Sequence, residues 1–167
     1  RSWVQPNYQP SVNPRKGLYA LDNIWDGLGA LIKMNPDISY FFGKVTMYPN
    51  YNTDARNFLL TFMNRFFPDQ EGLLSAHTPL DYSSDQELYL SKIETLTFSE
   101  AYKVLNSFVR EKKEFIPPLI NIYMNLSPTM KTFGTAVNSD FGNVEETAIL
   151  VRINDIYEDK KQRHLIF

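Results

Sequence analysis

The stretch that most constrains the fold of this chain runs from Glu114 to Asp155. Near its start, Pro117 and Pro118 favour the first turn of a helix, where a missing N–H group costs nothing. Near its end, the run 147–156 is apolar and β-branched, which is typical of a strand covered on both faces. We therefore expect a short helix, a turn and two apolar strands that meet at the polar segment 138–143.

Two details of this stretch carry further expectations. The short helix should present one apolar face, made of Leu119, Ile122, Tyr123 and Leu126. The segment 138–143 is rich in Asn, Asp and Gly and places polar groups at the edge of a core, where a site can form. Most segments of this composition are only turns, so both interpretations stay open.

The rest of the chain predicts alternating helices and strands. A helix is expected over about 18–34, a strand over 38–48 with Gly43 at its centre, and a second helix from an N-cap at Asn52 or Thr53 to Pro68. A glycine inside a strand marks a bulge or the close approach of a ligand. Residues 68–96 are irregular, and the charged carboxyl-terminal residues predict a solvated tail.

A third helix is expected after a capping box formed by Thr97 and Glu100. The order helix, strand, helix points to a mixed α/β (α+β) fold with a crossover connection. At 167 residues, with 43% hydrophobic and 14% aromatic residues, the chain can build the core of one domain or a large part of one.

Composition excludes several classes of function. A net charge of −2 without a basic stripe argues against nucleic-acid binding. The absence of cysteine removes disulfides, thiolate catalysis and cysteine zinc sites, and two distant histidines, His77 and His164, leave no expected metal site. No nucleophile elbow, phosphate loop or HExxH motif is present. The remaining chemistry lies in separate carboxylates: Asp22, Asp26, Asp140, Glu145, Glu146 and Asp155.

Without an apolar run of the roughly 18–20 residues that cross a bilayer, the chain is expected to be soluble and cytoplasmic. Its basic residues 160–163 leave open a peripheral contact with the inner membrane. Because the sequence begins with Arg1 and not Met, we expect a cut or proteolysed piece of a longer protein.

Three stretches resemble one family. They are RSWV at the start, LDNIWDGLGAL followed by YFFG over 21–43, and the segment from Pro118 to Val151 that contains Asp140-Phe141 and Thr147. In this order and spacing they resemble the N-acyltransferases that make ornithine and glycine lipids from acyl-acyl-carrier-protein, a group often labelled haemolysin. That group is GNAT-like and is related to the acyl-homoserine-lactone synthases.

The resemblance implies that residues 1–167 are the carboxyl-terminal portion of a single GNAT-like domain, starting at its fourth strand, with a helical insertion at about 68–115. The strands near Arg1–Val4 and 38–48 should splay apart and bind the amide-rich pantetheine arm through unpaired backbone groups. Acyl-carrier-protein or CoA would bring the fatty acyl thioester as a co-substrate, with no cofactor. An amino-acid acceptor would attack it, and the product would serve aminolipid synthesis.

The resemblance also assigns roles to residues. Asp140 would position or deprotonate the amine, and Tyr123 would give a proton to the leaving thiol; the glutamate expected three residues before Arg1 would lie outside this chain. The alternatives are that Asp140 only caps its turn and that Tyr123 is part of the core. Residues implied in substrate binding are Arg1, Ser2, Trp25, Phe41, Phe42, Gly43 and Phe141.

Two other classes of function stay open at this point. One is a non-catalytic module that binds acyl chains or lipid and has lost its chemistry. The other is a haemolysin, although no amphipathic pore-forming segment is evident. An open strand edge also leaves room for a homodimer.

Overall fold

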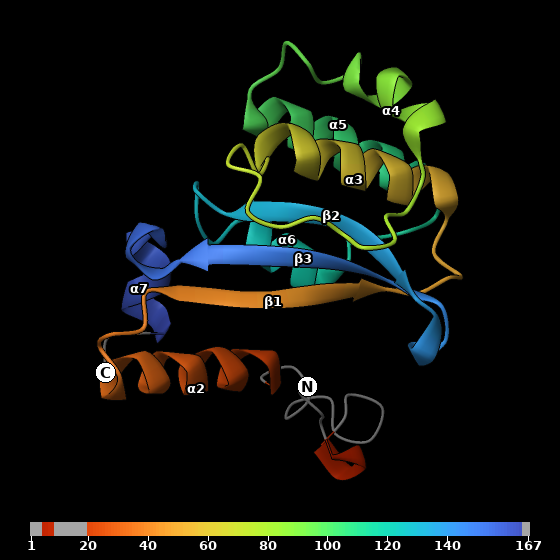
Figure 1. Cartoon of the computed structure of the whole chain (residues 1–167). Helices are drawn as coiled ribbons and strands as arrows, with labels where there is room; N and C mark the ends of the chain where they lie inside the picture. The colour runs from red at the N-terminus through yellow and green to blue at the C-terminus, as the bar shows by residue number, and fades with distance from the viewer. Residues whose placement is uncertain (1–4, 9–19, 165–167) are drawn as a thin grey trace. The chain divides into compact units, whose positions relative to one another are not determined.

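The computed structural model describes residues 5–8 and 20–164, which divide into two compact units (Figure 1). The first unit takes in the chain up to residue 39 and from residue 156 onward. It contains the short 3-10 helix η1 (Pro6–Tyr8), α2 (Ala20–Met34) and α7 (Glu158–His164), and α2 packs against α7. The predicted amphipathic helix is thus confirmed from Ala20 onward.

The expected solvated tail is wrong in one respect, because residues 158–164 form helix α7. Glu158 and Asp159 stand in its first turn, where negative charge is favoured by the helix dipole. Asp159 also pairs with Lys160 at 2.8 Å. The helix is nevertheless largely exposed, as a charged tail would be.

The second unit, residues 40–155, is built on a three-stranded sheet. Its strands are β1 (Tyr40–Met47), β2 (Lys131–Asn138) and β3 (Val144–Arg152), in the order β1-β3-β2 with antiparallel neighbours. β1 and β2 therefore run parallel, and the helical segment between them makes the crossover (Figure 1). The helices are α3 (Thr53–Phe66), α4 (Ser83–Leu90), α5 (Phe98–Glu111) and α6 (Pro118–Met124). This confirms the mixed α/β class, with a sheet flanked by helices, consistent with a GNAT-like acyltransferase fold.

The predicted helix caps are present. The Asn52 side chain accepts a hydrogen bond from the Ala55 N–H at 3.1 Å and begins α3. Thr97 and Glu100 form a capping box at the start of α5: the Glu100 N–H donates to the Thr97 hydroxyl at 3.4 Å, and the Thr97 N–H donates to the Glu100 carboxylate at 3.0 Å. These hydrogen bonds satisfy backbone donors that have no partner within the helix.

Helix α4 lies in a region where the sequence predicted irregular structure. Only Tyr89 of its eight residues is buried, so no apolar periodicity announces it. The Tyr89 ring stacks on Phe58 of α3 at a centroid distance of 5.1 Å, and it meets Phe108 of α5 edge-on at 5.6 Å. These ring contacts of Tyr89 help to hold the helix to α3 and α5.

The expected apolar face of α6 is wrong. The residues of this helix that are buried are Ile120 and Met124, four positions apart, whereas Leu119 is 36% exposed. Leu126 is buried but lies beyond the end of the helix. In a helix of seven residues, a shift of the core-facing stripe by one position changes most of its members.

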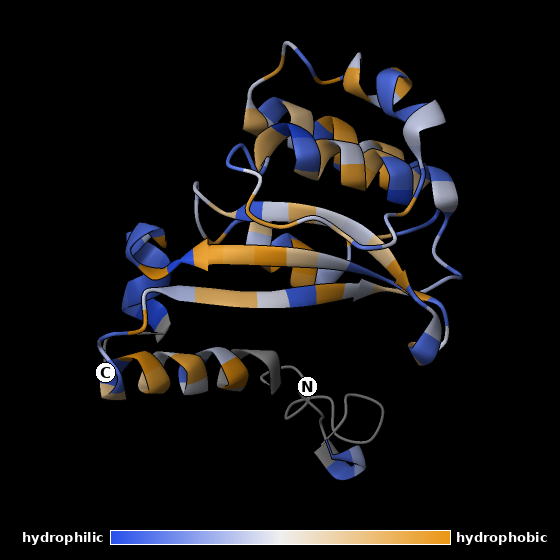
Figure 2. Ribbon diagram, in the orientation of Figure 1, coloured by the Kyte–Doolittle hydropathy of each residue, from blue (hydrophilic) through white to orange (hydrophobic). Residues whose placement is uncertain are grey.

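The sheet has one closed face and one open face, although β3 was expected to be covered on both. On the closed face, the β3 residues Glu145, Thr147, Ile149 and Val151 are all buried. On the open face, the β3 residues Glu146, Ala148 and Leu150 are half-buried and Arg152 is exposed, and Tyr40 and Phe42 of β1 are 51% and 64% exposed. Figure 2 shows the carboxyl-terminal half of β3 as a continuous hydrophobic run, so hydropathy alone conceals this difference between the faces.

Candidate functional site

The outer edge of β1 is the first candidate region. Within the described residues, β1 pairs only with β3, in an unbroken register from Tyr40 opposite Arg152 to Met47 opposite Glu145. The backbone N–H and C=O groups on its other side therefore offer a row of donors and acceptors to an extended ligand. The resemblance assigns a pantetheine arm to the splay between this strand and residues 1–4, which lie outside the described residues, so that assignment stays a prediction.

Gly43 lies in the middle of that strand and causes no bulge, since it stands in regular register opposite Ile149. A Cβ atom added at Gly43 would project on the same face of the sheet as Ile149 and would meet no described atom within 4 Å, so the space is open there. The register shift of this sheet is in β2 instead, between Thr132 and Thr135, where Gly134 has a φ of +86°. Of the two expectations for Gly43, the bulge is wrong and the close approach of a ligand stays a prediction.

The neighbouring aromatic residues point to opposite faces of the sheet, as alternation in a strand requires. Phe42 lies on the open face, 6.2 Å from the ring of Phe133. Phe41 lies on the closed face and is half-buried. An apolar chain that followed the open face would therefore meet Phe42.

Asp140 and Phe141 lie in the short 3-10 helix η2 (Ser139–Phe141), which joins β2 to β3. Gly142 and Asn143 complete this turn with positive φ angles of 68° and 56°. The turn stands at the end of the sheet where β1 finishes, because Met47 pairs with Glu145 and Glu145 with Val137. The Asp140 carboxyl is exposed and accepts no hydrogen bond from any described residue, so it does not cap the turn.

The other predicted residues are spread over the chain. Tyr123 is half-buried in α6, and burial raises the pKa of its hydroxyl, which keeps the proton that a donor needs. Trp25 is buried in α2 of the first unit. Arg1 and Ser2 lie outside the described residues. Phe42 and Gly43 are neighbours on β1 that face opposite sides of the sheet, and the roles of all these residues stay predictions.

A pocket of about 420 Å³ opens at the carboxyl end of β1, and we refer to it as the carboxyl-end pocket. One side of the pocket is formed by the end of β1 and the loop that follows it. The other side is formed by the segment that leads into α6 and by the first residues of that helix. Its lining is mainly aromatic and apolar, and its one carboxylate is that of Glu114. The residues that line it are Thr46, Met47, Tyr48, Asn50, Tyr51, Glu114, Phe115, Pro117, Pro118 and Leu119.

Hydrogen bonds hold the wall of the carboxyl-end pocket. The Tyr51 hydroxyl donates to the Phe115 carbonyl at 3.0 Å, and the Asn52 N–H donates to the Glu114 carboxylate at 3.0 Å. Burial, and then the nearby charge of Glu114, raise the pKa of Tyr51 to about 12. Phe115 is 68% exposed and offers an aromatic surface to a ligand.

A second pocket, of about 480 Å³, lies at the opposite end of the strand, and we refer to it as the amino-end pocket. It combines charged and apolar side chains from β1, β2, β3 and the loop before α4. Its Lys131 ammonium pairs with Glu71 at 2.6 Å, and the Thr129 hydroxyl donates to Asp155 at 2.6 Å. The lining residues are Tyr40, Glu71, Leu73, Thr129, Lys131, Leu150, Arg152 and Asp155.

Sequence reasoning missed both pockets. Asp155 was noted as an isolated carboxylate, but nothing in the sequence places it beside Tyr40 or Lys131. That proximity depends on the register of β3 against both neighbours, which pairs Leu150 with Phe42 on one side and with Lys131 on the other. Alternation of apolar residues indicates a strand and does not indicate its register.

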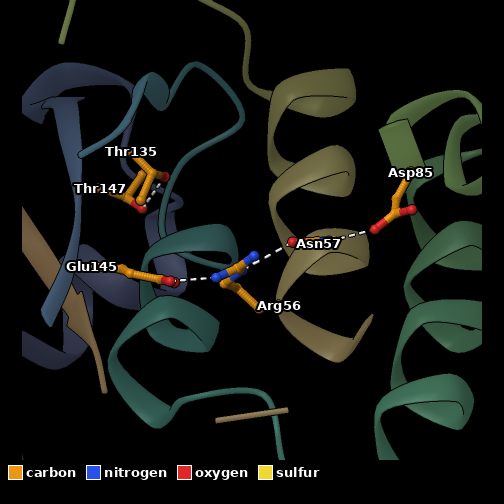
Figure 3. Close-up of polar contacts among 6 residues, drawn as sticks. All are labelled: Arg56, Asn57, Asp85, Thr135, Glu145 and Thr147. Atoms are coloured by element: carbon orange, nitrogen blue, oxygen red, sulfur yellow. Dashed lines mark hydrogen bonds and ion pairs between the residues drawn. The ribbon is translucent and has the colours of Figure 1, made fainter. Parts of the chain in front are cut away.

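A polar network crosses the closed side of the sheet (Figure 3). Arg56 of α3 forms an ion pair with Glu145 of β3, and its Nε donates to Asn57 at 2.9 Å. Asn57 in turn donates to Asp85 of α4 at 2.7 Å. Thr135 and Thr147 share a buried hydrogen bond of 2.7 Å between β2 and β3. The network ties two helices to the sheet near the end where β1 finishes.

Two further findings bound the chemistry of the described part of the chain. Residues 5–8 and 20–164 contain no group of three or more His, Cys, Asp or Glu side chains arranged to hold a metal ion. Over the same residues, no helix combines the length and the apolar character that a membrane span requires.

Comparison with known proteins gives two close relatives. The chain is 48% identical over 165 residues to a glycine N(alpha)-acyltransferase of Phocaeicola vulgatus and to one of Bacteroides thetaiotaomicron. The match covers 99% of this chain and 51% and 49% of the two relatives, so the chain spans about half the length of the curated relatives it matches. No family model and no solved structure matches. The predicted similarity to N-acyltransferases of amino acids is thereby confirmed.

Proposed function

We propose that this chain forms part of an N-acyltransferase that moves a fatty acyl group from a thioester to the amino group of glycine. The observation that carries the proposal is the 48% identity, over 99% of the chain, to two proteins named glycine N(alpha)-acyltransferase. In the proposal, residues 1–167 are the carboxyl-terminal portion of one GNAT-like domain. The products serve the synthesis of aminolipids such as glycine and ornithine lipids.

The donor site is assigned to the outer edge of β1 and the carboxyl-end pocket. A pantetheine arm carries two amide groups, which can pair with the free backbone groups of an edge strand. The strand rises by about 3.3 Å per residue, so Tyr40 and Thr46 lie about 20 Å apart along it. An extended arm that enters beside Phe115 can therefore carry its thioester toward Phe42 and Gly43.

The reaction needs a neutral amine, a donor to the carbonyl oxygen and a proton for the leaving sulfur. The ammonium of glycine loses one proton to a base, and its nitrogen forms a bond to the thioester carbon. The nitrogen gives up a second proton as the C–S bond breaks, and the leaving sulfur takes one proton to become the thiol. Asp140 is the proposed group that positions or deprotonates the amine, since its carboxyl is exposed and free of hydrogen bonds to described residues. Tyr123, which keeps its proton, is the proposed donor to sulfur.

Acyl-carrier-protein or CoA is the proposed carrier of the acyl group, and no further cofactor takes part. The proposed location is the cytoplasm, with contact at the inner membrane surface where lipid products leave. A second copy of the chain is a proposed partner in the absence of the thioester, because the edge of β1 can pair with another strand when no pantetheine arm occupies it.

The test is mass spectrometry of the whole protein incubated with an acyl-acyl-carrier-protein thioester and, separately, glycine, ornithine, lysine and homoserine. An N-acylated glycine is the expected product. Bound thioester without turnover would instead identify a non-catalytic acyl-binding module. Asp140→Asn should lower the rate at saturating glycine, with Asp37→Asn as a control at another exposed carboxyl; unchanged turnover in Asp140→Asn would remove its assigned role.

A further inference from the structure

We propose that the amino-end pocket binds the acceptor amino acid as a zwitterion, with its carboxylate on Arg152 and its ammonium on Asp155. This inference rests on the proposed transfer of an acyl group to glycine, because it assigns a place to the acceptor of that reaction. It puts the amine beside Asp155, at the opposite end of β1 from Asp140, and it therefore replaces the role proposed for Asp140. It follows from the charges that line the pocket, from the partners those charges have, and from the place of the pocket on β1.

Arg152 is the lining cation with open donors. The other lining cation, Lys131, is paired with Glu71 at 2.6 Å, whereas the exposed Arg152 side chain makes no hydrogen bond or ion pair with any residue that the structure describes. Arg152 ends β3 on the open face, directly opposite Tyr40. A guanidinium in this position can bind a carboxylate through two parallel hydrogen bonds.

Asp155 supplies the opposite charge three residues later. Its Oδ2 accepts a hydrogen bond from the Thr129 hydroxyl at 2.6 Å, which fixes the carboxylate and leaves its other oxygen for a ligand. Asp155 ends the 3-10 helix η3 (Ile153–Asp155), and Ile153 in that helix is buried. The segment that carries both charges is thus anchored before any ligand arrives, which lowers the cost of ordering it on binding.

The balance of charge favours a zwitterion over an anion. Two cations, Arg152 and Lys131, and two carboxylates, Glu71 and Asp155, line the pocket, so its formal charge is zero. An anionic ligand would gain from Arg152 and be repelled by Asp155, whereas an α-amino acid carries an ammonium and a carboxylate on the same carbon atom. The remaining walls come from the apolar side chains of Leu73 and Leu150 and from the ring of Tyr40.

The volume and position of the pocket fit the second substrate of the reaction. At about 480 Å³ it is larger than glycine and leaves room for the end of a thioester arm arriving along β1. Acylation converts the ammonium to a neutral amide, and the product then loses its attraction to Asp155. The same pocket therefore favours the substrate over the product and helps the product to leave.

The experiment is an NMR titration of the 15N-labelled protein, without any acyl donor, using four probes: glycine, acetate, methylammonium and N-acetylglycine. We expect glycine to shift the signals of residues 150–155, including the Arg152 Nε–H. The three probes that lack one of the two charges should bind at least about tenfold more weakly, because each lost charged hydrogen bond has about that effect. If acetate or N-acetylglycine binds as tightly as glycine, the claim that the pocket recognises a zwitterion is overturned. If the shifts are confined to residues outside the pocket, the assignment of the site is overturned.

Two variants test the residues. Arg152→Gln should weaken glycine binding at least about tenfold, and Arg152→Lys should restore part of it, since a lysine keeps the charge and loses the planar fork. Arg65→Gln, which removes an exposed arginine of α3 outside the pocket, should leave glycine binding unchanged. Unaltered binding in a folded Arg152→Gln protein would overturn the inference.

These outcomes are separable from those of the proposed function. If the whole protein makes N-acylglycine while Arg152→Gln keeps the parental KM for glycine, the pocket assignment fails and the acyl transfer stands. If glycine binds here and no acylated product forms with any donor, the acyl transfer fails and the binding site stands.

Discussion

The two pockets at the ends of β1 differ most in charge. The carboxyl-end pocket is lined by aromatic and proline side chains, with Glu114 as its carboxylate, already engaged by the Asn52 N–H. The amino-end pocket has two residues of each sign, of which Arg152 has no described partner. The same edge strand thus connects an apolar site with a charged one. The difference suits the two substrates of an acyl transfer, an acyl thioester and an amino acid.

The largest expected effect concerns the path between the pockets. Gly43→Val should lower turnover of the whole protein about 100-fold, because displacing a reacting group by about 1 Å has an effect of that order. An added Cβ has open space, since nothing described lies within 4 Å of it, and thermal unfolding shows whether the methyl groups of valine are also accommodated. Initial rates and thermal unfolding are the measurements.

Gly27→Ala is the matched control, because Gly27 in α2 also has open space around an added Cβ. Its turnover should equal that of the parent. A folded Gly43→Val protein with the parental rate would show that no ligand passes along this part of β1.

The next prediction compares the stability that two ion pairs contribute on opposite faces of the sheet. The pairs are formed by the neighbouring residues Glu145 and Glu146. Arg56→Met leaves the buried Glu145 carboxylate without its ion pair and should lower the free energy of unfolding by about 2–4 kcal/mol. Lys44→Met removes one of the partners of Glu146 on the open face, where the Lys44 side chain is 54% exposed, and should cost less than about 1 kcal/mol.

Urea unfolding of both variants measures this difference between the faces. Equal losses of stability in Arg56→Met and Lys44→Met would mean that the closed face is no more tightly held than the open one. The polar network of Figure 3 would then not be the main source of stability at the end of the sheet where β1 finishes.

A smaller effect is expected in the carboxyl-end pocket. Phe115→Ala removes an aromatic surface that is 68% exposed without ligand, and it should raise the KM for the acyl thioester about fivefold to tenfold. The KM for glycine should stay as it is. Steady-state kinetics with each substrate varied in turn measure both values. A change in the glycine KM of comparable size would argue against separate sites.

The smallest effect is a pH dependence of stability that belongs to the carboxyl-end pocket. The pKa of Tyr51 is about 12 in the folded protein, above the ordinary tyrosine pKa of 10. A group with a raised folded pKa contributes stability that is complete below the unfolded pKa and is lost as pH rises through the folded pKa. The parent should therefore lose more stability than Tyr51→Phe between about pH 10 and pH 12. Identical curves from denaturant titrations would contradict the burial of this hydroxyl.

Local chemistry in the sequence predicted much of the fold. The side chains of Asn52, Thr97 and Glu100 have their hydrogen-bond partners within a few residues, so their roles could be inferred without tertiary structure. The buried face of α6 could not be inferred in this way, because whether Leu119 or Ile120 is buried depends on which side of the helix packs against the core.

The candidate site was predictable only in part. The edge of β1 and Gly43 were inferred from a run of apolar residues and a family resemblance. The sequence did not predict that one pocket is lined by Tyr40, Lys131, Arg152 and Asp155. Their proximity depends on the registers of two strand pairs and on the path of a loop. Residues separated by more than a hundred positions give no local signal of such a meeting.

The most direct test of the division between the two pockets is a paired kinetic measurement on the whole protein. Initial rates of N-acylglycine formation are measured for Arg152→Gln and Phe115→Ala, with glycine and the acyl-acyl-carrier-protein thioester each varied at saturation of the other. The division predicts that Arg152→Gln raises only the KM for glycine and Phe115→Ala raises only the KM for the thioester. If both variants raise the same KM, or if Arg152→Gln leaves the glycine KM unchanged, the two ends of β1 do not serve different substrates.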